Sequence, residues 1–242
     1  MIRVFFVLTW LSVLAMGTAA NAACSSKSGN TVCEFDPRKD KLAFYNLDAA
    51  GQPYGGFEAL RMALASQGQQ LLFAMNIGMF GADLKPVGLY VEGGKQLHKI
   101  NRASGPGNFH MKPNGIFYIA GGKAGVMETD AYSRSGIKPD FATQSGPMMV
   151  INGAMHPKIS PDGTSAKLRN GVCVNDAGKI EFVISDGFVT FFDFASFFTD
   201  ELGCKNVLFL DGSVSSLYAP ELGRADFLAS LGPMVGVTAP AK

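Results

Sequence analysis

A carboxylate at the end of an apolar run is the strongest chemical signal in this sequence. Asp211 follows the predicted strand 206–210 and precedes a turn of glycine, valine and serines at 212–216. Such a turn surrounds the carboxylate with backbone N–H groups and hydroxyls, which suits a nucleophile, a general base or an anion site. Asp-Gly followed by serines is equally an ordinary turn, so the pattern alone leaves both interpretations open.

Two further segments place charged side chains next to β-prone runs. Asp186 follows the apolar run 182–184, and Arg169 directly precedes a β-prone run that starts at Asn170. An arginine at the mouth of a strand can hold a phosphate through two N–H groups, and it can equally pair with a structural carboxylate. Glycine-rich loops at 105–109 and 144–147 add amide and hydroxyl donors. Together these segments predict a polar site for an oxygen-rich ligand.

Three short segments with one common plan predict β-hairpins. Residues 86–95, 114–123 and 170–179 each contain a short β-prone run and a glycine-containing turn that ends in lysine, and a second β-prone run follows. Alternating β-prone runs around a glycine turn are typical of hairpins. Their number favours a β-rich body.

Two helices are expected, each followed by an apolar strand. The first covers 56–67, and the second runs from Asp193, its expected N-cap, to Leu202. The strands 70–75 and 206–210 follow and lead into polar, glycine-rich loops. This repeated order predicts an α+β fold: a single β-rich domain of mixed sheets and hairpins with a few packed helices and two related halves.

The N-terminal segment has the features of a secretory signal peptide. Residues 1–22 combine a basic Arg3, an apolar stretch at 4–16 and small residues at Ala20 and Ala22. The stretch is shorter than the roughly 20 residues that span a membrane. We therefore expect cleavage near Ala22 and a mature domain over 23–242, located in the periplasm or secreted, with no further membrane span.

The composition excludes a strongly charged partner class. The 242 residues include 47% hydrophobic and 17% charged side chains, and the formal net charge is +1. Loss of Arg3 with the signal peptide would reduce the charge of the remainder to zero. Because a protein that binds nucleic acid needs a basic excess to neutralise phosphates, nucleic acid is not an expected partner.

Four cysteines in an exported chain predict two disulfides. Cys24, Cys33, Cys173 and Cys204 allow three pairings, and the sequence does not choose among them. We favour Cys24–Cys33 as a short N-terminal link and Cys173–Cys204 as a link between a strand and a helix end. No two cysteines have the CxxC spacing of a zinc site, so no metal site is predicted.

The order of several short motifs resembles the phosphodiester glycosidase family, which includes the lysosomal uncovering enzyme, and in particular its bacterial exported branch. The resemblance covers about residues 24–237. The motifs that carry it are AMNIGMF at 74–80, PVGLY at 86–90, NF at 108–109, PNGIF at 113–117, ATQSGP at 142–147, RNG at 169–171, SDG at 185–187 and LDGS at 210–213. The uncovering enzyme has a glycine-rich run where this chain has SVSS at 213–216, so the resemblance does not carry over a substrate.

The resemblance implies a hydrolase that cleaves a sugar-1-phosphodiester, at the bond between the anomeric carbon and the phosphate oxygen, in envelope or extracellular glycans. The transition state of this reaction carries positive charge on the sugar, and carboxylates stabilise it. The resemblance therefore implies that Asp211 and Asp186 act at the sugar and that Arg169 holds the phosphate, with Ser213 and the N–H groups of its loop. The residues expected to bind the substrate are Asn76, Phe80, Asn108, Asn114, Ser145, Gly146, Asn170, Gly212, Ser213 and Ser216.

The mature chain would contain no tryptophan, so another aromatic side chain must stack on a sugar. The candidates are Phe80, Tyr90, Phe109 and Tyr218. The expected partner is a carbohydrate or sugar-phosphate substrate, and no cofactor is expected, although the sequence leaves open whether a divalent cation assists. A non-catalytic protein that binds envelope polysaccharide or peptidoglycan would have a similar polar site, and this alternative also stays open, as does the oligomeric state.

Overall fold

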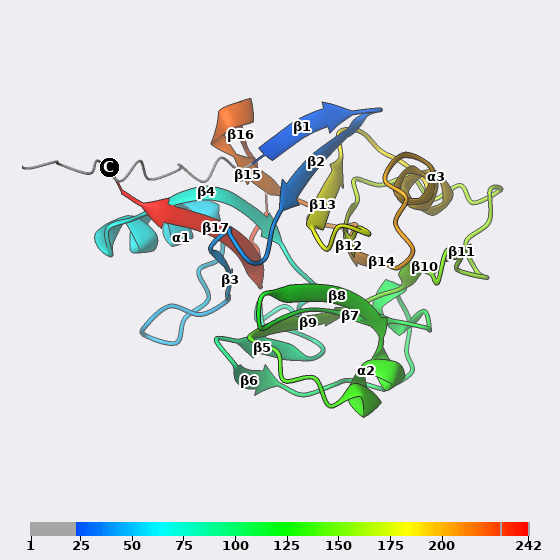
Figure 1. The fold of residues 1–242 in the computed structure, drawn as a ribbon, viewed down its shortest axis with the longest axis horizontal. Coiled ribbons are helices and arrows are strands. Elements are labelled where there is room, and N and C mark those ends of the chain that lie inside the picture. Colours follow the sequence, from blue (N-terminus) through cyan, green and yellow to red (C-terminus); the bar gives the residue numbers. More distant parts are fainter. Residues whose placement is uncertain (1–22, 228, 242) are drawn as a thin grey trace, which may run out of the picture.

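A computed structural model describes residues 23–227 and 229–241 of the chain. The predicted signal peptide lies outside the described residues. Three antiparallel sheets surround one core, and helices cover their outer faces (Figure 1). In the described part of the chain, no helix has the length and hydropathy needed to cross a membrane.

The strands form one seven-stranded and two five-stranded sheets. The seven-stranded sheet has the order β1 (Ala23–Lys27), β2 (Asn30–Phe35), β13 (Ile180–Ser185), β12 (Asn170–Val174), β14 (Val207–Asp211), β10 (Met148–Ile151) and β11 (Ala154–Met155). The sheet around β4 has the order β16 (Arg224–Ala225), β15 (Leu217–Ala219), β4 (Gln69–Asn76), β17 (Met234–Pro240) and β3 (Leu42–Tyr45). The sheet around β9 has the order β6 (Lys95–His98), β5 (Tyr90–Glu92), β9 (Phe141–Ser145), β7 (Gly115–Ala120) and β8 (Lys123–Glu128).

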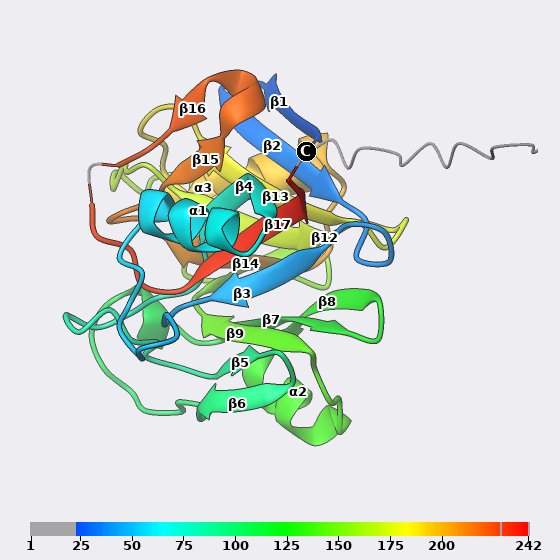
Figure 2. The same cartoon turned by 90° about the vertical axis from the view of Figure 1, so that its left-hand side faces the viewer.

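Each sheet has its own helix. The helices are α1 (Phe57–Ser66), α2 (Thr129–Ser135) and α3 (Phe191–Ser196), which continues as the π-helical turn η2 (Phe197–Glu201); short 3-10 turns are η1 (Asn108–His110) and η3 (Pro220–Leu222). Figure 2 shows α1 lying across β4 and β17 on the outer side of their sheet. The apolar face of α3 packs on the seven-stranded sheet, and α2 packs on the β9 sheet through Tyr132.

Aromatic side chains from all three sheets meet in the central core. The rings of Phe35 and Phe73 lie 4.7 Å apart and join the seven-stranded sheet to the β4 sheet. The ring centre of Phe117 in the β9 sheet lies 5.7 Å from that of Phe182 and 6.2 Å from that of Phe44. Because each ring removes a large apolar area from water, this cluster fixes how the three sheets sit relative to one another.

The predicted β-rich α+β fold is confirmed, and so are its three hairpins. β5–β6 turns at Gly93 and Gly94, β7–β8 turns at Gly121 and Gly122, and β12 pairs with β13 over the third predicted segment. All four turn glycines have a positive φ, a conformation that costs a side chain with a Cβ. The expected relation between two halves of the domain stays a prediction.

The second helix begins earlier than expected. Thr190, and not Asp193, is the N-cap of α3, and its hydroxyl oxygen accepts the N–H of Asp193. Asp193 is the third residue of the helix, and its carboxylate accepts the Thr190 hydroxyl at 2.8 Å. Asp193 thus bonds back to the hydroxyl of the cap, whereas in a capping box the acidic side chain would accept the backbone N–H of the cap. The first helix lies within its expected range.

Both favoured disulfides are present. Cys24–Cys33 joins β1 to β2, and Cys173–Cys204 joins β12 to the segment after η2. Disulfides persist in oxidising compartments, so the pairing is compatible with an extracytoplasmic protein.

Candidate functional site

The carboxyl ends of three strands, one from each sheet, meet at one edge of the core. The side chain of Asn170, which begins β12, donates to the backbone oxygen of Asn76 at the end of β4 at 2.9 Å. The hydroxyl of Ser145 at the end of β9 donates to the backbone oxygen of Leu210 in β14 at 3.0 Å. The loops that follow β4, β9 and β14 therefore come together, although they are far apart in the sequence.

Asp211 lies at this junction, where β14 ends. Its Oδ1 accepts the backbone N–H groups of Ser213 and Val214, which close the loop into a tight turn around the carboxylate. The residue is 7% exposed. Burial raises the pKa of Asp211, and the N–H groups of Ser213, Val214 and Gly212 partly oppose this change. The second oxygen, Oδ2, makes no hydrogen bond to any described residue.

A cavity of about 370 Å³ opens over Asp211. Three segments supply its wall, and the residues that line it are Met79, Phe80, Gly107, Asn108, Asp211, Gly212, Ser213 and Val214. Five of them were predicted from the sequence: Phe80, Asn108, Asp211, Gly212 and Ser213. The carboxylate therefore shares the cavity with an aromatic side chain, an amide and a hydroxyl.

Met79, Gly107 and Val214 also line the cavity. The sequence reasoning included them in its loops and motifs but not among the site residues. Each is the neighbour of a residue that it did name, so proximity in the chain was the available signal. Gly107 has a φ of +84°, which only glycine adopts readily, and it turns the chain so that Asn108 can begin η1.

Three of the predicted substrate-binding residues lie beneath the loop and do not line the cavity. Oδ1 of Asn76 accepts the N–H of Ser216 at 2.9 Å and the side-chain amide of Asn170 at 3.1 Å. The Ser215 hydroxyl adds a bond to the backbone oxygen of Asp211 at 3.0 Å. All these residues are buried. This network holds the Asp211 loop in place, which is a different role from the expected contact with sugar hydroxyls.

The other three, Asn114, Ser145 and Gly146, position η1 and β9. The side-chain amide of Asn114 donates to the backbone oxygen of Phe109 at 3.0 Å, which fixes the turn that carries Asn108. A Cβ on Gly146 would lie 2.7 Å from Cβ of Asn114 and 3.0 Å from the Phe109 oxygen. Glycine at this position therefore lets η1 approach the end of β9.

Arg169 is buried below the cavity, although the sequence suggested that it faces the ligand. It is 1% exposed, and its Nε and Nη2 donate to the backbone oxygens of Val189 and Ser165 at 2.9 and 2.7 Å. The guanidinium carbon stands 3.7 Å from the ring centre of Phe191. Burial lowers its pKa to about 10, so the group stays positively charged at neutral pH.

The charge of Arg169 still acts near Asp211. A Cβ on Gly212 would lie 3.4 Å from Nη1 of Arg169, so the guanidinium reaches the backbone of the loop from below. Arg169 makes no ion pair with any described carboxylate. Its positive charge is thus available to stabilise an anion in the cavity above Gly212 without direct contact.

Asp186 ends β13 at the same edge of the sheet as Asp211 but outside the cavity. β12 lies between β13 and β14, so two strand spacings, roughly 10 Å, separate the two carboxylates. Asp186 accepts the Thr31 hydroxyl at 2.7 Å and pairs with Nη1 of Arg224 at 3.1 Å. The structure thus brings Arg169 and Asp211 together but holds Asp186 in a separate exposed ion pair.

Of the four aromatic candidates for stacking on a sugar, one lines the cavity and three lie elsewhere. Phe80 lines the cavity, whereas Tyr90 and Phe109 are buried in the core. Tyr218 lines a neighbouring hollow on the outer face of the β4 sheet. Phe80 is therefore the predicted platform that faces Asp211.

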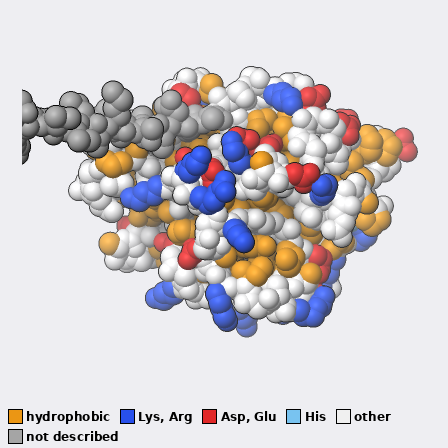
Figure 3. Space-filling view, in the orientation of Figure 1, with side chains coloured by type: hydrophobic (Ala, Val, Ile, Leu, Met, Phe, Trp, Pro, Cys, Tyr) orange, Lys and Arg blue, Asp and Glu red, His pale blue; other side chains and the backbone are white. Residues whose placement is uncertain are grey.

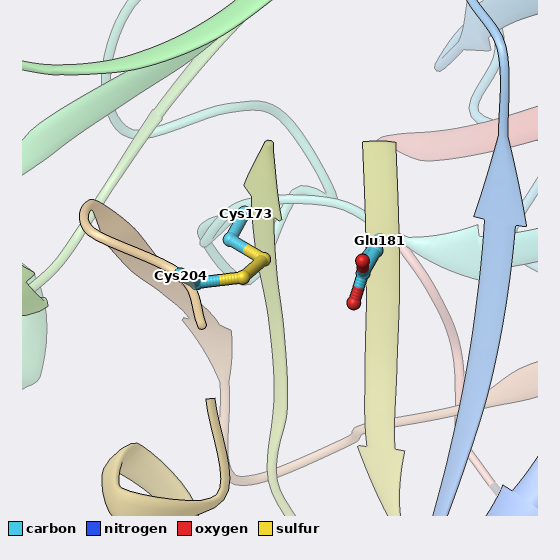
Figure 4. Close-up of side chains that lie close together, drawn as sticks. All are labelled: Cys173, Glu181 and Cys204. Atoms are coloured by element: carbon cyan, nitrogen blue, oxygen red, sulfur yellow. A yellow bond between two sulfur atoms is a disulfide. The ribbon is translucent and has the colours of Figure 1, made fainter. Parts of the chain in front are cut away.

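One cluster of potential metal ligands occurs among the described residues, but its chemistry does not suit a metal ion. The ligand atoms of Cys173, Cys204 and Glu181 lie within 4.8 Å of one another. Figure 4 shows the two sulfur atoms joined in a disulfide, with the Glu181 carboxyl beside them. A bonded sulfur is not a thiolate, and burial raises the pKa of Glu181, so these groups do not suit a cation.

The surface charge agrees with the balanced composition. Figure 3 shows several basic side chains close together left of centre on this face, with acidic ones among them, and further basic side chains along the lower edge.

Comparison with known proteins identifies the family. The profile of the phosphodiester glycosidase family matches residues 69–229, which include both β4 and the Asp211 loop. The chain belongs to the phosphodiester glycosidase family. Its sequence is 38% identical to the uncharacterized protein YigE of Escherichia coli K12 over 218 residues, 89% of this chain and 84% of that protein. The resemblance inferred from the motifs is confirmed.

Solved structures show the same fold. This phosphodiester glycosidase family member is similar to the catalytic domain of zebrafish N-acetylglucosamine-1-phosphodiester alpha-N-acetylglucosaminidase, auto-inhibited by its pro-peptide. The TM-score is 0.62 and the identity 14%, over 86% of this chain and 76% of that one. A hypothetical protein from Synechocystis matches with a TM-score of 0.52 and 15% identity, over 90% of this chain and 61% of that one.

Proposed function

We propose that this protein is an exported hydrolase that cleaves a sugar-1-phosphodiester at the bond between the anomeric carbon and the phosphate oxygen. The observation that carries the proposal is the position of Asp211: its carboxylate opens into a cavity of about 370 Å³, and the N–H groups of Ser213 and Val214 fix one of its oxygens. Membership of the phosphodiester glycosidase family supports the same reaction class.

In the proposed reaction, Asp211 acts on the sugar side. The bond between C1 and oxygen breaks, the electron pair leaves with the phosphate monoester, and water supplies the hydroxyl on C1. Asp211 either takes the proton of this water or first bonds to C1, and in both cases its negative charge stabilises the positive sugar ring. A phosphate monoester is a good leaving group, so a second carboxyl acting as general acid is not required.

The phosphate needs donors that the protein does not already use. The N–H groups of Ser213 and Val214 donate to Asp211, so they are not free to hold a phosphate as the sequence suggested. We assign this role to the exposed Ser213 hydroxyl and the Asn108 amide, which both line the cavity. Arg169 below Gly212 adds positive potential. Phe80 supplies the apolar surface on which the sugar ring stacks.

The test is hydrolysis of methyl hexose-1-phosphodiesters, as α and β anomers, by the purified protein in water enriched in oxygen-18. The proposal predicts that the label enters the released sugar and not the phosphate. Asp211→Asn should lower the rate by about 100-fold or more, because loss of an acid–base group typically costs this much. Asp176→Asn, at an exposed aspartate paired with Lys205, is the matched control.

Two outcomes would contradict the proposal. Label in the phosphate would show cleavage of the bond between phosphorus and oxygen, which is a different reaction. Retention of the phosphodiester without any product, with Asp211→Asn equal to the wild type, would favour the alternative of a non-catalytic carbohydrate-binding protein.

A further inference from the structure

A second hollow lies on the outer face of the β4 sheet, at the start of α1. Its volume is about 440 Å³, and four aromatic side chains form much of its wall: Tyr54, Phe57, Tyr218 and Phe227. The role assigned to Asp211 does not involve any of these residues. A concave surface with several aromatic faces is typical of a binding site for a ring-shaped ligand.

Contacts with other aromatic rings hold three of these four side chains in place. Tyr218 packs on Phe57 with ring centres 6.3 Å apart, and Tyr54 meets Tyr45 edge-on at 6.5 Å. Phe227 is different, because it is 85% exposed at the rim of the hollow. A large apolar side chain left in water next to a concave aromatic surface is available to cover a ligand there.

The side chain of Val214 lies between the two hollows. Val214 lines the Asp211 cavity and also packs against the apolar cluster that contains Phe57 and Leu231, which line the second hollow. Gly232 follows Leu231 in the chain and lies directly against Phe80, the aromatic platform of the first cavity. A Cβ added to Gly232 would lie 2.5 Å from the Phe80 ring. The second hollow is therefore the neighbour of the proposed catalytic cavity, one side chain away.

The chemistry of the wall favours a neutral sugar. Glu58 and Asp226 line the hollow beside the aromatic rings, and among the described lining residues there is no lysine or arginine. Carboxylates accept hydrogen bonds from sugar hydroxyls, and the apolar face of a pyranose packs on aromatic rings. Each carboxylate is paired with an arginine just outside the hollow, Glu58 with Arg61 at 2.6 Å and Asp226 with Arg224 at 3.1 Å. The rim therefore carries balanced charges and polar groups, which suit a neutral ligand rich in hydroxyls.

We propose that this hollow is a second subsite, which binds a neutral pyranose unit of the saccharide chain that carries the scissile phosphodiester. The inference rests on the proposed function for the identity of the ligand as a whole. What it adds is the position of a second sugar unit, next to the one at the scissile bond, which would pack against Tyr54, Tyr218 and Phe227. A substrate with several sugar units would then be bound better than a single sugar phosphodiester.

Calorimetric titration with neutral oligosaccharides tests the subsite without any hydrolysis. The purified protein carrying Asp211→Asn is titrated with maltohexaose, cellohexaose and chitohexaose, none of which contains a phosphate. Saturable binding of at least one is expected. Phe227→Ala should weaken it about three- to tenfold, the range that loss of one aromatic stacking partner gives. Phe188→Ala is the matched control, because Phe188 is also exposed, at 75%, but does not line the hollow.

Three results would overturn the subsite. One is the absence of binding for all three saccharides up to about 10 mM, a concentration at which weak carbohydrate sites are filled. Another is equal weakening by Phe227→Ala and Phe188→Ala. The third is binding of octanol but not of the saccharides, which would assign the hollow to a hydrocarbon chain. Failure of hydrolysis with saccharide binding intact would refute only the proposed function.

Discussion

Replacing Gly146 with alanine tests whether the turn that carries Asn108 is held against the end of β9. The new methyl group would lie 2.7 Å from Cβ of Asn114 and 3.0 Å from the backbone oxygen of Phe109. Ordinary contacts begin at 3.4 Å, so the overlaps are 0.7 and 0.4 Å. One of the two neighbours must move for the methyl group to fit.

Neither neighbour can move cheaply. Asn114 is buried, and its side chain donates to the Phe109 oxygen at 3.0 Å and accepts the Thr129 hydroxyl at 2.8 Å. Overpacking typically costs about 1–3 kcal/mol, and we expect Gly146→Ala to lower the free energy of unfolding by about 2 kcal/mol. The displaced turn would also carry Asn108 away from Asp211, and a displacement of about 1 Å in a site costs up to about 100-fold in rate.

The measurement is urea unfolding followed by circular dichroism, together with hydrolysis of the methyl phosphodiester. A loss of 2 kcal/mol corresponds to a midpoint lower by about 1 M urea. Gly187→Ala is the control, since a Cβ at that position meets nothing within 4 Å. Equal midpoints for the two variants would refute the reasoning, because they would show that η1 is free to yield.

Three further predictions concern the charged groups. Arg169→Met should lower the free energy of unfolding by about 2 kcal/mol, because the charged hydrogen bonds to the backbone oxygens of Val189 and Ser165 are lost; an unchanged urea midpoint would contradict this. Burial raises the pKa of Asp211 above its ordinary 3.8, so its stabilising contribution is complete below that value and is lost as pH rises through the folded pKa. Asp211→Asn should therefore be more stable than the wild type at pH 7, and the difference should vanish near pH 3; a constant difference in melting temperature would argue against the burial effect. Asp186→Asn should cost less than about 1 kcal/mol, as expected for an exposed ion pair, whereas a rate loss equal to that of Asp211→Asn would restore the two-carboxylate site predicted from the sequence.

The local elements of this fold were accessible from the sequence because their signals are local. The hairpins at Gly93–Gly94 and Gly121–Gly122 follow from glycines that adopt a positive φ between β-prone runs. The start of α3 was placed too late because both Thr190 and Asp193 are good caps. Only the structure shows that Thr190 caps the helix by accepting the N–H of Asp193, and that Asp193 lies inside the helix.

The candidate site was predicted in part for the same reason. Asp211, Gly212 and Ser213 are consecutive, so any fold that ends a strand at Asp211 keeps them together. Phe80 and Asn108 come from other loops, which the sequence indicated both as glycine-rich segments and as motifs of the family. That these five residues line one cavity depends on the junction of β4, β9 and β14, where bonds such as that between Ser145 and Leu210 join different sheets.

By itself the sequence determined the residue types, the family, the hairpins, two of the three α-helices and the carboxylate at the end of β14, whereas α2 was not predicted. Only the tertiary structure decided whether each polar side chain faces the cavity, is buried, or pairs with another residue. The sequence predicted that Arg169 binds the phosphate and that Asp186 acts at the sugar. In the structure, Arg169 is buried under the Asp211 loop and Asp186 is paired with Arg224. The physical reason is that burial and pairing depend on neighbours brought in from distant segments, and no local pattern of residues records them.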